Sequence, residues 1–278
     1  MAANTFPNSK MDLIANIVQR ELEFQAKLLP TITDVSQWAQ PGARSIAFPK
    51  LTSFAVNNRA FGAADTEQTL TDTTDVIQLD KNRIVSWVVD MKDDLQASFD
   101  SQAELAKRAA AAHGRDMDNE ILAVLEADGV ATATVGAITR DIILEMQTSL
   151  FDREAIEDDI VLVVGNDSHE ELLKISEFTE HQIYGPNNAI RGGQIGTVYG
   201  MPVIRRSGIA ANTYYMYERG GVALGMQAAP SMDSEKDIQY GTGAMRFAMD
   251  VLYGVDSLQR GEKGVGATES ALIVKDGN

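Results

Sequence analysis

The sequence predicts an α+β fold built around one long helix, and three observations lead to this prediction. Residues 101–125 repeat apolar side chains every three or four positions, which is the period of a helix. Residues 44–91 contain two strand-like runs separated by a polar segment, which is the pattern of a β-hairpin. From residue 133 onward, amphipathic helices mix with short strands punctuated by glycines.

The long helix is expected to begin at Ser101, because Ser101 and Glu104 have the spacing of a capping box. Asp128 and Gly129 are expected to end it. We expect its apolar stripe to pack on the closing strands near the end of the chain. The stripe consists of Ala106, Ala110, His113, Met117, Ile121 and Val124. The charged residues expected on its solvated face are Lys107, Arg108, Arg115, Asp116, Asp118 and Glu120.

Ahead of the hairpin, residues 11–29 have the spacing of an amphipathic helix that Pro30 ends. This arm precedes any obvious core, so it packs either on its own body or on a neighbouring subunit. The hairpin limbs are residues 44–56 and 76–91, and Pro49 makes the first limb an edge strand. The polar, Thr-rich residues 57–75 between them are typical of a functional projection.

After the long helix, Thr139 is expected to cap a helix over residues 140–151 whose inward side chains are Ile142, Ile143, Met146 and Leu150. The apolar run 160–164 predicts a buried strand, and residues 166–168 are expected to cap a helix over 169–178. Further strands are predicted over residues 194–199, 203–204, 214–216, 236–240 and 245–253.

The net charge of −16 is concentrated in one part of the chain. Residues 1–92 carry 9 Lys/Arg against 10 Asp/Glu, whereas residues 93–278 carry 15 against 30. An acidic body repels phosphate, which argues against sequence-directed binding of nucleic acid. The absence of cysteine excludes disulfides and thiolate catalysis. The sequence has neither an apolar run of about 18 residues nor a secretory leader, so no membrane span is predicted.

The three histidines do not form a recognisable site. His169 and Glu170 begin like a zinc-protease helix, but Leu173 stands where the second histidine would be needed. His169 is therefore expected at the surface. His113 lies on the apolar stripe and is expected to be a hydrogen-bonded interior or interface histidine, whereas His181 is expected in a solvated loop.

Two other patterns also lack the spacing of a ligand site. The glycines of residues 192–200 do not open a helix, as a dinucleotide site requires, and the acidic run 154–159 lacks the spacing of an EF-hand loop. Arg205 and Arg206 are expected to form an intersubunit salt bridge. The sequence therefore indicates no catalytic, cofactor-binding or metal-ligating residue.

Residues 193–207, GQIGTVYGMPVIRRS, resemble a signature of tailed-bacteriophage major capsid proteins of the Hong Kong 97 (HK97) fold. Residues 217–227 and 246–253 resemble the segments that follow this signature, and residues 93–100 resemble the entry to the long spine helix. The order of elements is also similar, and the likeness runs from about residue 11 to residue 256. The resemblance implies an N-terminal arm (1–43), an extended hairpin loop (44–92), a peripheral domain with the spine helix (93–132 and 226–278) and an axial domain (133–225).

By function, the resemblance implies a major capsid protein without catalytic activity, located in the virion after assembly in the host cytoplasm. Its expected partners are copies of itself as pentamers and hexamers, together with portal, scaffolding and decoration proteins, and the enclosed DNA without sequence-specific binding. Alternatives are an encapsulin-type compartment shell and a cytoplasmic enzyme. Lys50, Asn57 and Asn58 do not match the lysine–asparagine crosslink of one branch, so no crosslink is predicted. No scaffolding segment is expected to be fused within the 278 residues.

Overall fold

The computed structural model describes residues 26–51, 56–59, 61–62, 64, 67, 72–90, 101–132, 136–175, 196–240, 244–258 and 273–275. The helices described are α3 (Ser101–Asp128), α4 (Arg140–Phe151) and α5 (Asn166–Lys174), with 3-10 turns η1 (Leu29–Thr31), η2 (Ser36–Trp38), η3 (Glu157–Asp159), η4 (Arg219–Gly221) and η5 (Ile238–Tyr240). The strands described are β1 (Thr33–Asp34), β2 (Ser45–Leu51), β3 (Asp72–Gln78), β4 (Lys81–Asp90), β5 (Val130–Ala131), β6 (Ile160–Val164), β7 (Thr197–Val198), β8 (Met201–Arg205), β9 (Tyr214–Glu218), β10 (Val222–Lys236), β11 (Ala244–Ser257) and β12 (Ile273–Lys275).

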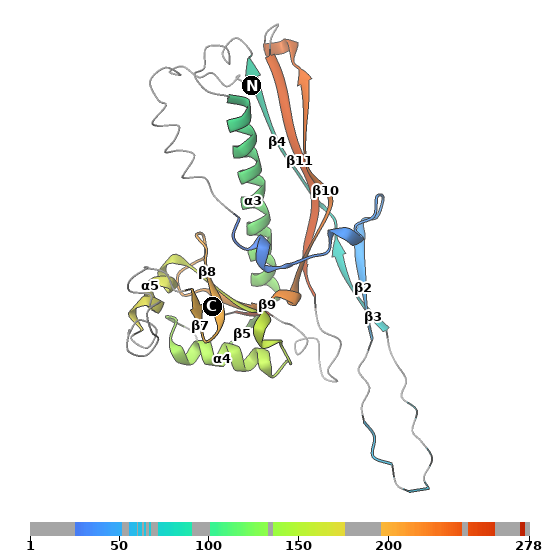
Figure 1. Ribbon diagram of the computed structural model, residues 1–278, viewed down its shortest axis with the longest axis vertical. Coiled ribbons are helices and arrows are strands. Elements are labelled where there is room, and N and C mark those ends of the chain that lie inside the picture. Colours follow the sequence, from blue (N-terminus) through green and yellow to red (C-terminus); the bar gives the residue numbers. More distant parts are fainter. Residues whose placement is uncertain are drawn as a thin grey trace.

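The long helix α3 lies along a four-stranded sheet of order β1-β10-β11-β4 (Figure 1). Alternate residues of β4 and β11 face the helix, so Trp87 stacks on its register partner Phe247 with ring centroids 5.8 Å apart. Ala109 of α3 packs into the same cluster. His113 of α3 is buried, and its Nε2 lies 3.1 Å from the carbonyl of Met249. The prediction that this helix packs on the closing strands through an interior histidine is therefore confirmed.

A second sheet has the order β5-β12-β9-β6-β8-β7. Side chains of its central strand β6 alternate between two clusters, because successive residues of a strand point to opposite faces. Leu162 packs with α4 and α5 on one face, and Val161 packs with Ile121 and Leu125 of α3 on the other. Both faces are covered, which explains the continuous apolar run of β6. Helix α3 thus contacts both sheets.

The hairpin β2–β3 projects away from both sheets (Figure 1). Its root is fixed by close packing: a Cβ on Gly254 of β11 would lie 2.0 Å from the carbonyl oxygen of Gln78, and one on Gly225 of β10 would lie 2.7 Å from Ile46. These two glycines let the hairpin cross directly over β10 and β11. Among the described residues β2 pairs only with β3, in agreement with the edge strand that Pro49 predicts.

Two predicted elements agree with the structure residue by residue. Helix α4 spans Arg140–Phe151, and its N-cap Thr139 accepts a hydrogen bond from the backbone N–H of Ile142 at 3.4 Å. The four side chains predicted to point inward are all buried. Strand β6 spans Ile160–Val164 and is buried throughout. Both elements are encoded by local patterns.

Four predictions are wrong. Ala110 of the predicted stripe is exposed, and its neighbour Ala109 packs on the sheet instead. The stripe members His113, Met117 and Ile121 are buried as predicted. The run 76–91 does not form one limb, since the chain turns after Gln78 and β4 joins β11. The run 236–240 is the end of β10 followed by η5. Helix α5 begins at Asn166 with Gly165 as its N-cap and ends at Lys174.

Other predictions fall outside the described residues. They concern the arm helix before residue 26, the helix entry over 93–100, the loop containing His181 and the strand residues before 196. The last strand, β12, pairs with β9 in the six-stranded sheet. No strand was predicted at this position, and residues 226–278 were expected to belong to the peripheral domain.

Candidate functional site

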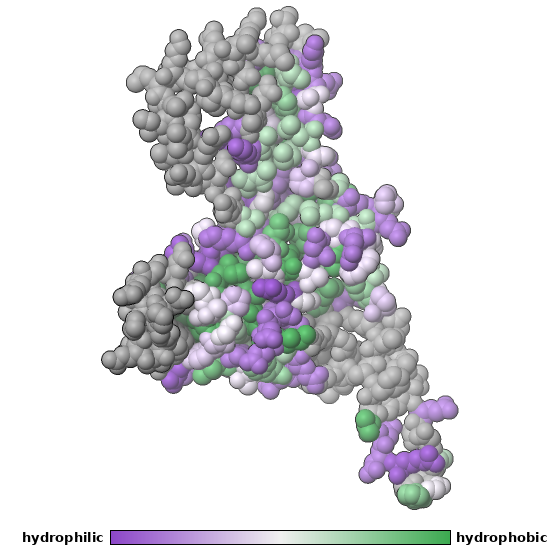
Figure 2. All heavy atoms as spheres, viewed as in Figure 1, coloured by the Kyte–Doolittle hydropathy of each residue, from purple (hydrophilic) through white to green (hydrophobic). Residues whose placement is uncertain are grey.

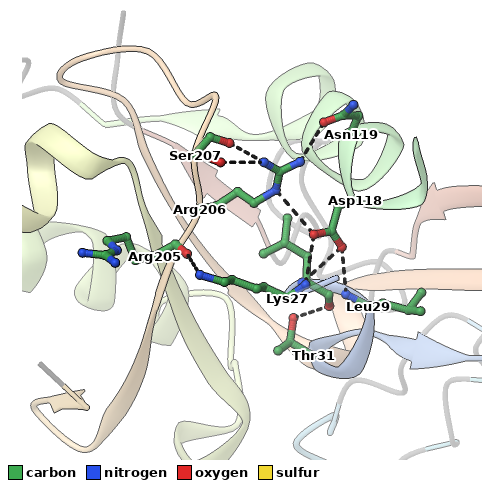
Figure 3. Close-up of polar contacts among 9 residues, drawn as sticks. Lys27, Leu29, Thr31, Asp118, Asn119, Arg205, Arg206 and Ser207 are labelled. Atoms are coloured by element: carbon green, nitrogen blue, oxygen red, sulfur yellow. Dashed lines mark hydrogen bonds and ion pairs between the residues drawn. The ribbon is translucent and has the colours of Figure 1, made fainter. Parts of the chain in front are cut away.

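A buried carboxylate in the middle of α3 joins three distant segments of the chain. The side chain of Asp118 is completely buried. Its oxygens accept hydrogen bonds from the backbone N–H groups of Lys27, Leu28 and Leu29 at 3.0, 3.2 and 3.3 Å (Figure 3). Three consecutive N–H donors at the start of η1 make a favourable site for a negative charge. The carboxylate therefore holds residues 27–29 of the N-terminal arm on α3.

Arg206 reaches the same carboxylate from the six-stranded sheet. Its Nε lies 3.4 Å from Oδ2 of Asp118, and both side chains are buried, at 5% and 0% exposure. Its guanidinium also donates to Oδ1 of Asn119 at 2.8 Å and to the carbonyl of Ser207 (Figure 3). The backbone N–H of Arg206 donates to Val164 at the end of β6, which fixes where the side chain starts.

The arm is also bonded directly to the loop that follows β8. Nζ of Lys27 donates to the carbonyl of Arg205 at 3.2 Å. We call the group Lys27, Leu28, Leu29, Asp118, Arg205 and Arg206 the arm junction. Beside it, Thr31 and Tyr217 share a hydrogen bond of 2.5 Å between their hydroxyls, and burial raises the pKa of Tyr217 to about 12. The buried Leu28 packs against α3 and the six-stranded sheet.

A second ionic group, the β4 cluster, lies on the side of α3 that faces the four-stranded sheet. It consists of Lys81, Arg83, Asp116, Glu120 and Tyr253. Arg83 bonds Asp116 at 3.1 Å and Glu120 at 2.6 Å, and the hydroxyl of Tyr253 donates to Asp116 at 2.8 Å. The hydrogen bond to Glu120 and the charge of Asp116 raise the pKa of Arg83, whereas burial raises that of Tyr253.

The C-terminal end of α3 is tied to the six-stranded sheet by a third group. The hydroxyl of Tyr215 donates to Glu126 at 2.7 Å, and Lys275 of β12 lies 3.1 Å from the same carboxylate. The hydrogen bond from Tyr215, followed by the bond and charge of Lys275, lowers the pKa of Glu126. Nζ of Lys275 also donates to the carbonyl of Glu126, where a cation stabilises a helix end.

The far end of the hairpin presents apolar side chains to solvent. Val56 and Phe61 are fully exposed, and hydrophilic and hydrophobic residues lie side by side at this end of the molecule (Figure 2). Asn57, Asn58 and Arg59 are exposed beside them. Such side chains contribute nothing to the core of their own subunit, so they are available for contacts with other molecules.

Several residues singled out in the sequence lie elsewhere than predicted. Asp118 was expected on the solvated face of α3 and is completely buried. Arg206 was expected between subunits, but it pairs within its own chain. His169 was expected at the surface and is buried; this burial, together with the charge of Arg205, lowers its pKa. The sequence contained a signal for the burial of Asp118. This residue lies three positions before Ile121 and seven before Leu125, which places it on the same helix face as these two buried residues.

Other classes of site receive no support from the described part of the chain. Within it, no group of three or more His, Asp or Glu side chains is arranged to hold a metal ion. None of the helices described there is long and apolar enough to cross a membrane. The acidic run 154–159 is mostly exposed, as expected for a solvated loop.

Solved structures with the same arrangement of elements come from phage capsids. A structure from Mycobacterium phage Che8 superposes with a TM-score of 0.74 at 18% identity, covering 90% of each chain. The capsid structure of cyanophage P-SCSP1u gives 0.71 at 10% identity, covering 99% of this chain and 92% of the other. The mature capsid of bacteriophage PhiM1 gives 0.66 at 14% identity, covering 91% and 86%. The predicted α+β capsid fold is thus confirmed.

A family model described as phage capsid protein matches residues 16–254, and the chain belongs to this family. No curated protein matches the sequence. The chain is therefore a structural protein, the major capsid protein of a phage head, and it is located in the capsid of the virion. The resemblance found in the sequence is confirmed.

Proposed function

We propose that copies of this chain join as pentamers and hexamers into the icosahedral head shell of a tailed double-stranded DNA phage. In this assembly the hairpin of each copy lies on a neighbouring copy. The observation that carries the proposal is the projecting hairpin with its fully exposed Val56 and Phe61. Burying a side chain of this size against a neighbour stabilises a contact by about 1.5–3 kcal/mol. Closed symmetry repeats such a contact at every subunit.

The hairpin can be tested without disturbing its root. Replacing residues 56–67 by a short Gly-Asn turn leaves β2 and β3 paired, because their register ends at Leu51 and Asp72. We expect folded subunits, measured by circular dichroism, and no shells in negative-stain electron microscopy. Phe61→Ser should have the same effect in weaker form, and Asn58→Ser in the same tip is the matched control. Normal shells from the shortened hairpin would contradict the proposed contact.

The proposal also includes partner proteins of the shell. Portal, scaffolding and decoration proteins are the partners implied by the capsid resemblance. The test is to express the chain alone and together with a scaffolding protein, and to measure its sedimentation. Closed particles, pentamers or hexamers are expected. A persistent monomer at high concentration under both conditions would refute the shell subunit.

The charge of the body suits a wall that encloses DNA without binding its sequence. Residues 93–278 carry twice as many acidic as basic residues, so phosphate contacts are disfavoured. The purified subunit should not retain duplex DNA in a gel-shift assay at moderate salt. Tight binding that weakens steeply with salt would contradict this part of the proposal.

We also propose a domain division that modifies the boundaries expected from the sequence. The arm and the extended hairpin loop remain the first two parts. Strand β4 is assigned to the peripheral domain because it pairs with β11, and β12 is assigned to the axial domain because it pairs with β9. The loop then ends near residue 80 rather than residue 92.

A further inference from the structure

We propose that Asp118 is a positioning residue for shell assembly. It fixes the direction in which the N-terminal arm leaves the body and the angle between α3 and the six-stranded sheet, and thereby the curvature of the shell. The proposal rests on the proposed function, since curvature has meaning only for a shell subunit. It concerns the arm junction, whose groups lie inside one subunit.

The direction of the arm follows from the type of bond that holds it. Asp118 accepts the backbone N–H groups of Lys27, Leu28 and Leu29, so it fixes the path of the main chain itself. Hydrogen bonds are directional, whereas apolar packing tolerates sliding and rotation. Leu28 and Thr31, next to these bonds, are buried in the body. The arm junction therefore fixes where residues 27–29 of the arm lie on the body.

The angle of the six-stranded sheet depends on the same carboxylate. Arg206 follows β8 and approaches Oδ2 of Asp118 at 3.4 Å, while its guanidinium donates to Asn119 on the next position of α3. Lys27 closes the ring, because its Nζ donates to the carbonyl of Arg205 at 3.2 Å. Arm, helix and sheet are thus bonded pairwise around one buried charge (Figure 3).

A buried charge suits this role because it tolerates few alternative arrangements. A carboxylate and a guanidinium removed from water are stable only while both stay paired. Any rotation of the sheet or the arm that separates Asp118 from its donors leaves a charge buried without its partner. A shell of one size requires the same angles in quasi-identical subunits, since small angular changes alter closure.

The experiment compares Asp118→Asn with Asp116→Asn. Asparagine keeps the size of the side chain but presents a donor where Asp118 faces only donors. Asp116 is a matched control two positions away, because it pairs with Arg83 and Tyr253, all within α3 and the four-stranded sheet. Trypsin cleavage of the Lys27–Leu28 bond in unassembled subunits, followed by mass spectrometry, measures release of the arm. Particle diameters from electron microscopy measure curvature.

We expect Asp118→Asn to be cleaved at this bond at least about tenfold faster than wild type. Losing one hydrogen bond to a charged group shifts the equilibrium between the held and the released arm by about tenfold or more. Its particles should be broad in diameter or open, while Asp116→Asn behaves as wild type in both assays. Arg206→Lys keeps a cation beside Asp118 but loses the guanidinium that donates hydrogen bonds to both Asn119 and Ser207. It should broaden the diameters with nearly normal cleavage, and it decides the question if Asp118→Asn does not fold.

Two results would overturn the proposal: particles of wild-type diameter and spread from the Asp118 and Arg206 variants, or faster cleavage in Asp116→Asn than in Asp118→Asn. Failure of the proposed function is distinguishable, because it would appear as wild-type protein that forms no shell. The cleavage assay on unassembled subunits would then still report whether Asp118 holds the arm.

Discussion

Asp116 and Asp118 stand two positions apart on α3 and both pair with an arginine, yet they connect different parts of the molecule. The side chains of Asp116 and Arg83 are 37% and 43% exposed, whereas those of Asp118 and Arg206 are 0% and 5% exposed. Asp116 binds β4 and β11, which already pack against α3 through an apolar core. Asp118 binds the arm and the loop after β8.

The difference shows how burial changes what an ion pair does. A half-exposed ion pair exchanges contacts with water for contacts with protein, so it gains little free energy. It adds slightly to the stability of a contact that apolar packing already holds. A buried pair gains little over an apolar contact of the same shape, but breaking one half of it is costly. The arm junction therefore specifies how the arm and the six-stranded sheet are placed on α3. The β4 cluster reinforces the packing of α3 on the four-stranded sheet.

The largest expected effect comes from Asp118→Ala. It leaves the buried guanidinium of Arg206 without its ion pair and three backbone N–H groups without their acceptor. We expect a loss of about 3–5 kcal/mol in the free energy of unfolding. Urea unfolding of unassembled subunits measures it without contributions from shell contacts. A loss below about 1 kcal/mol would show that the two carboxylates do not differ as their burial implies.

The next effect tests the apolar contact between α3 and the four-stranded sheet. Ala109 packs against Trp87, Phe247 and Met249, so Ala109→Leu should overpack this contact at a cost of about 1–3 kcal/mol. The exposed neighbours provide matched controls, since Ala110→Leu and Lys107→Ala should each stay within about 0.5 kcal/mol. Urea unfolding of the three variants gives the comparison. A larger loss in the free energy of unfolding for Ala110→Leu than for Ala109→Leu would mean that another face of α3 packs on the sheet.

This one-position error illustrates what the sequence could predict. Helix α4 and strand β6 were predicted to the residue because a cap and an apolar period are local signals. The partner of β4 was not predictable in this way, since its register with β11 joins residues far apart in the chain. A run of alternating side chains specifies a strand and its faces, but it does not specify which strand lies next to it.

The arm junction was missed for a related reason. The helical period places Asp118 on α3, but it was expected to be exposed because most charged side chains are exposed. Its burial depends on Arg206 and on the N–H groups of the arm, which come from elements about 90 residues away in either direction. By contrast, the interior role of His113 was predictable, since a histidine within an apolar stripe needs only one nearby carbonyl.

A smaller effect is expected from Asp116→Ala. Arg83 keeps Glu120 at 2.6 Å and remains partly solvated, so the free energy of unfolding should fall by about 1 kcal/mol or less. Because the pair is partly exposed, the loss should shrink as salt rises. Urea unfolding at low and high ionic strength measures both quantities. A loss that is large and independent of salt would mean that the β4 cluster behaves like the arm junction.

The smallest effect concerns a buried group that stays neutral, His169. Burial and the nearby positive charge of Arg205 lower its pKa in the folded protein. As the pH falls through the ordinary pKa of histidine, about 6.5, the unfolded chain takes up a proton that the native state resists. The free energy of unfolding should therefore decrease as the pH falls from 7 to 5.5, in addition to the contribution of carboxylates common to all variants.

His169→Gln removes this titration while keeping a polar side chain of similar size. The difference in the free energy of unfolding between pH 7 and pH 5.5 should be smaller in the variant than in wild type, with the gap closing above pH 7. Urea unfolding at several pH values measures the two slopes. The side chain of Asp118 is surrounded by hydrogen-bond donors, whereas a cationic His169 would face another cation. Equal slopes would mean that His169 is protonated as readily in the native state as in the unfolded chain, and that burial near Arg205 does not govern its charge.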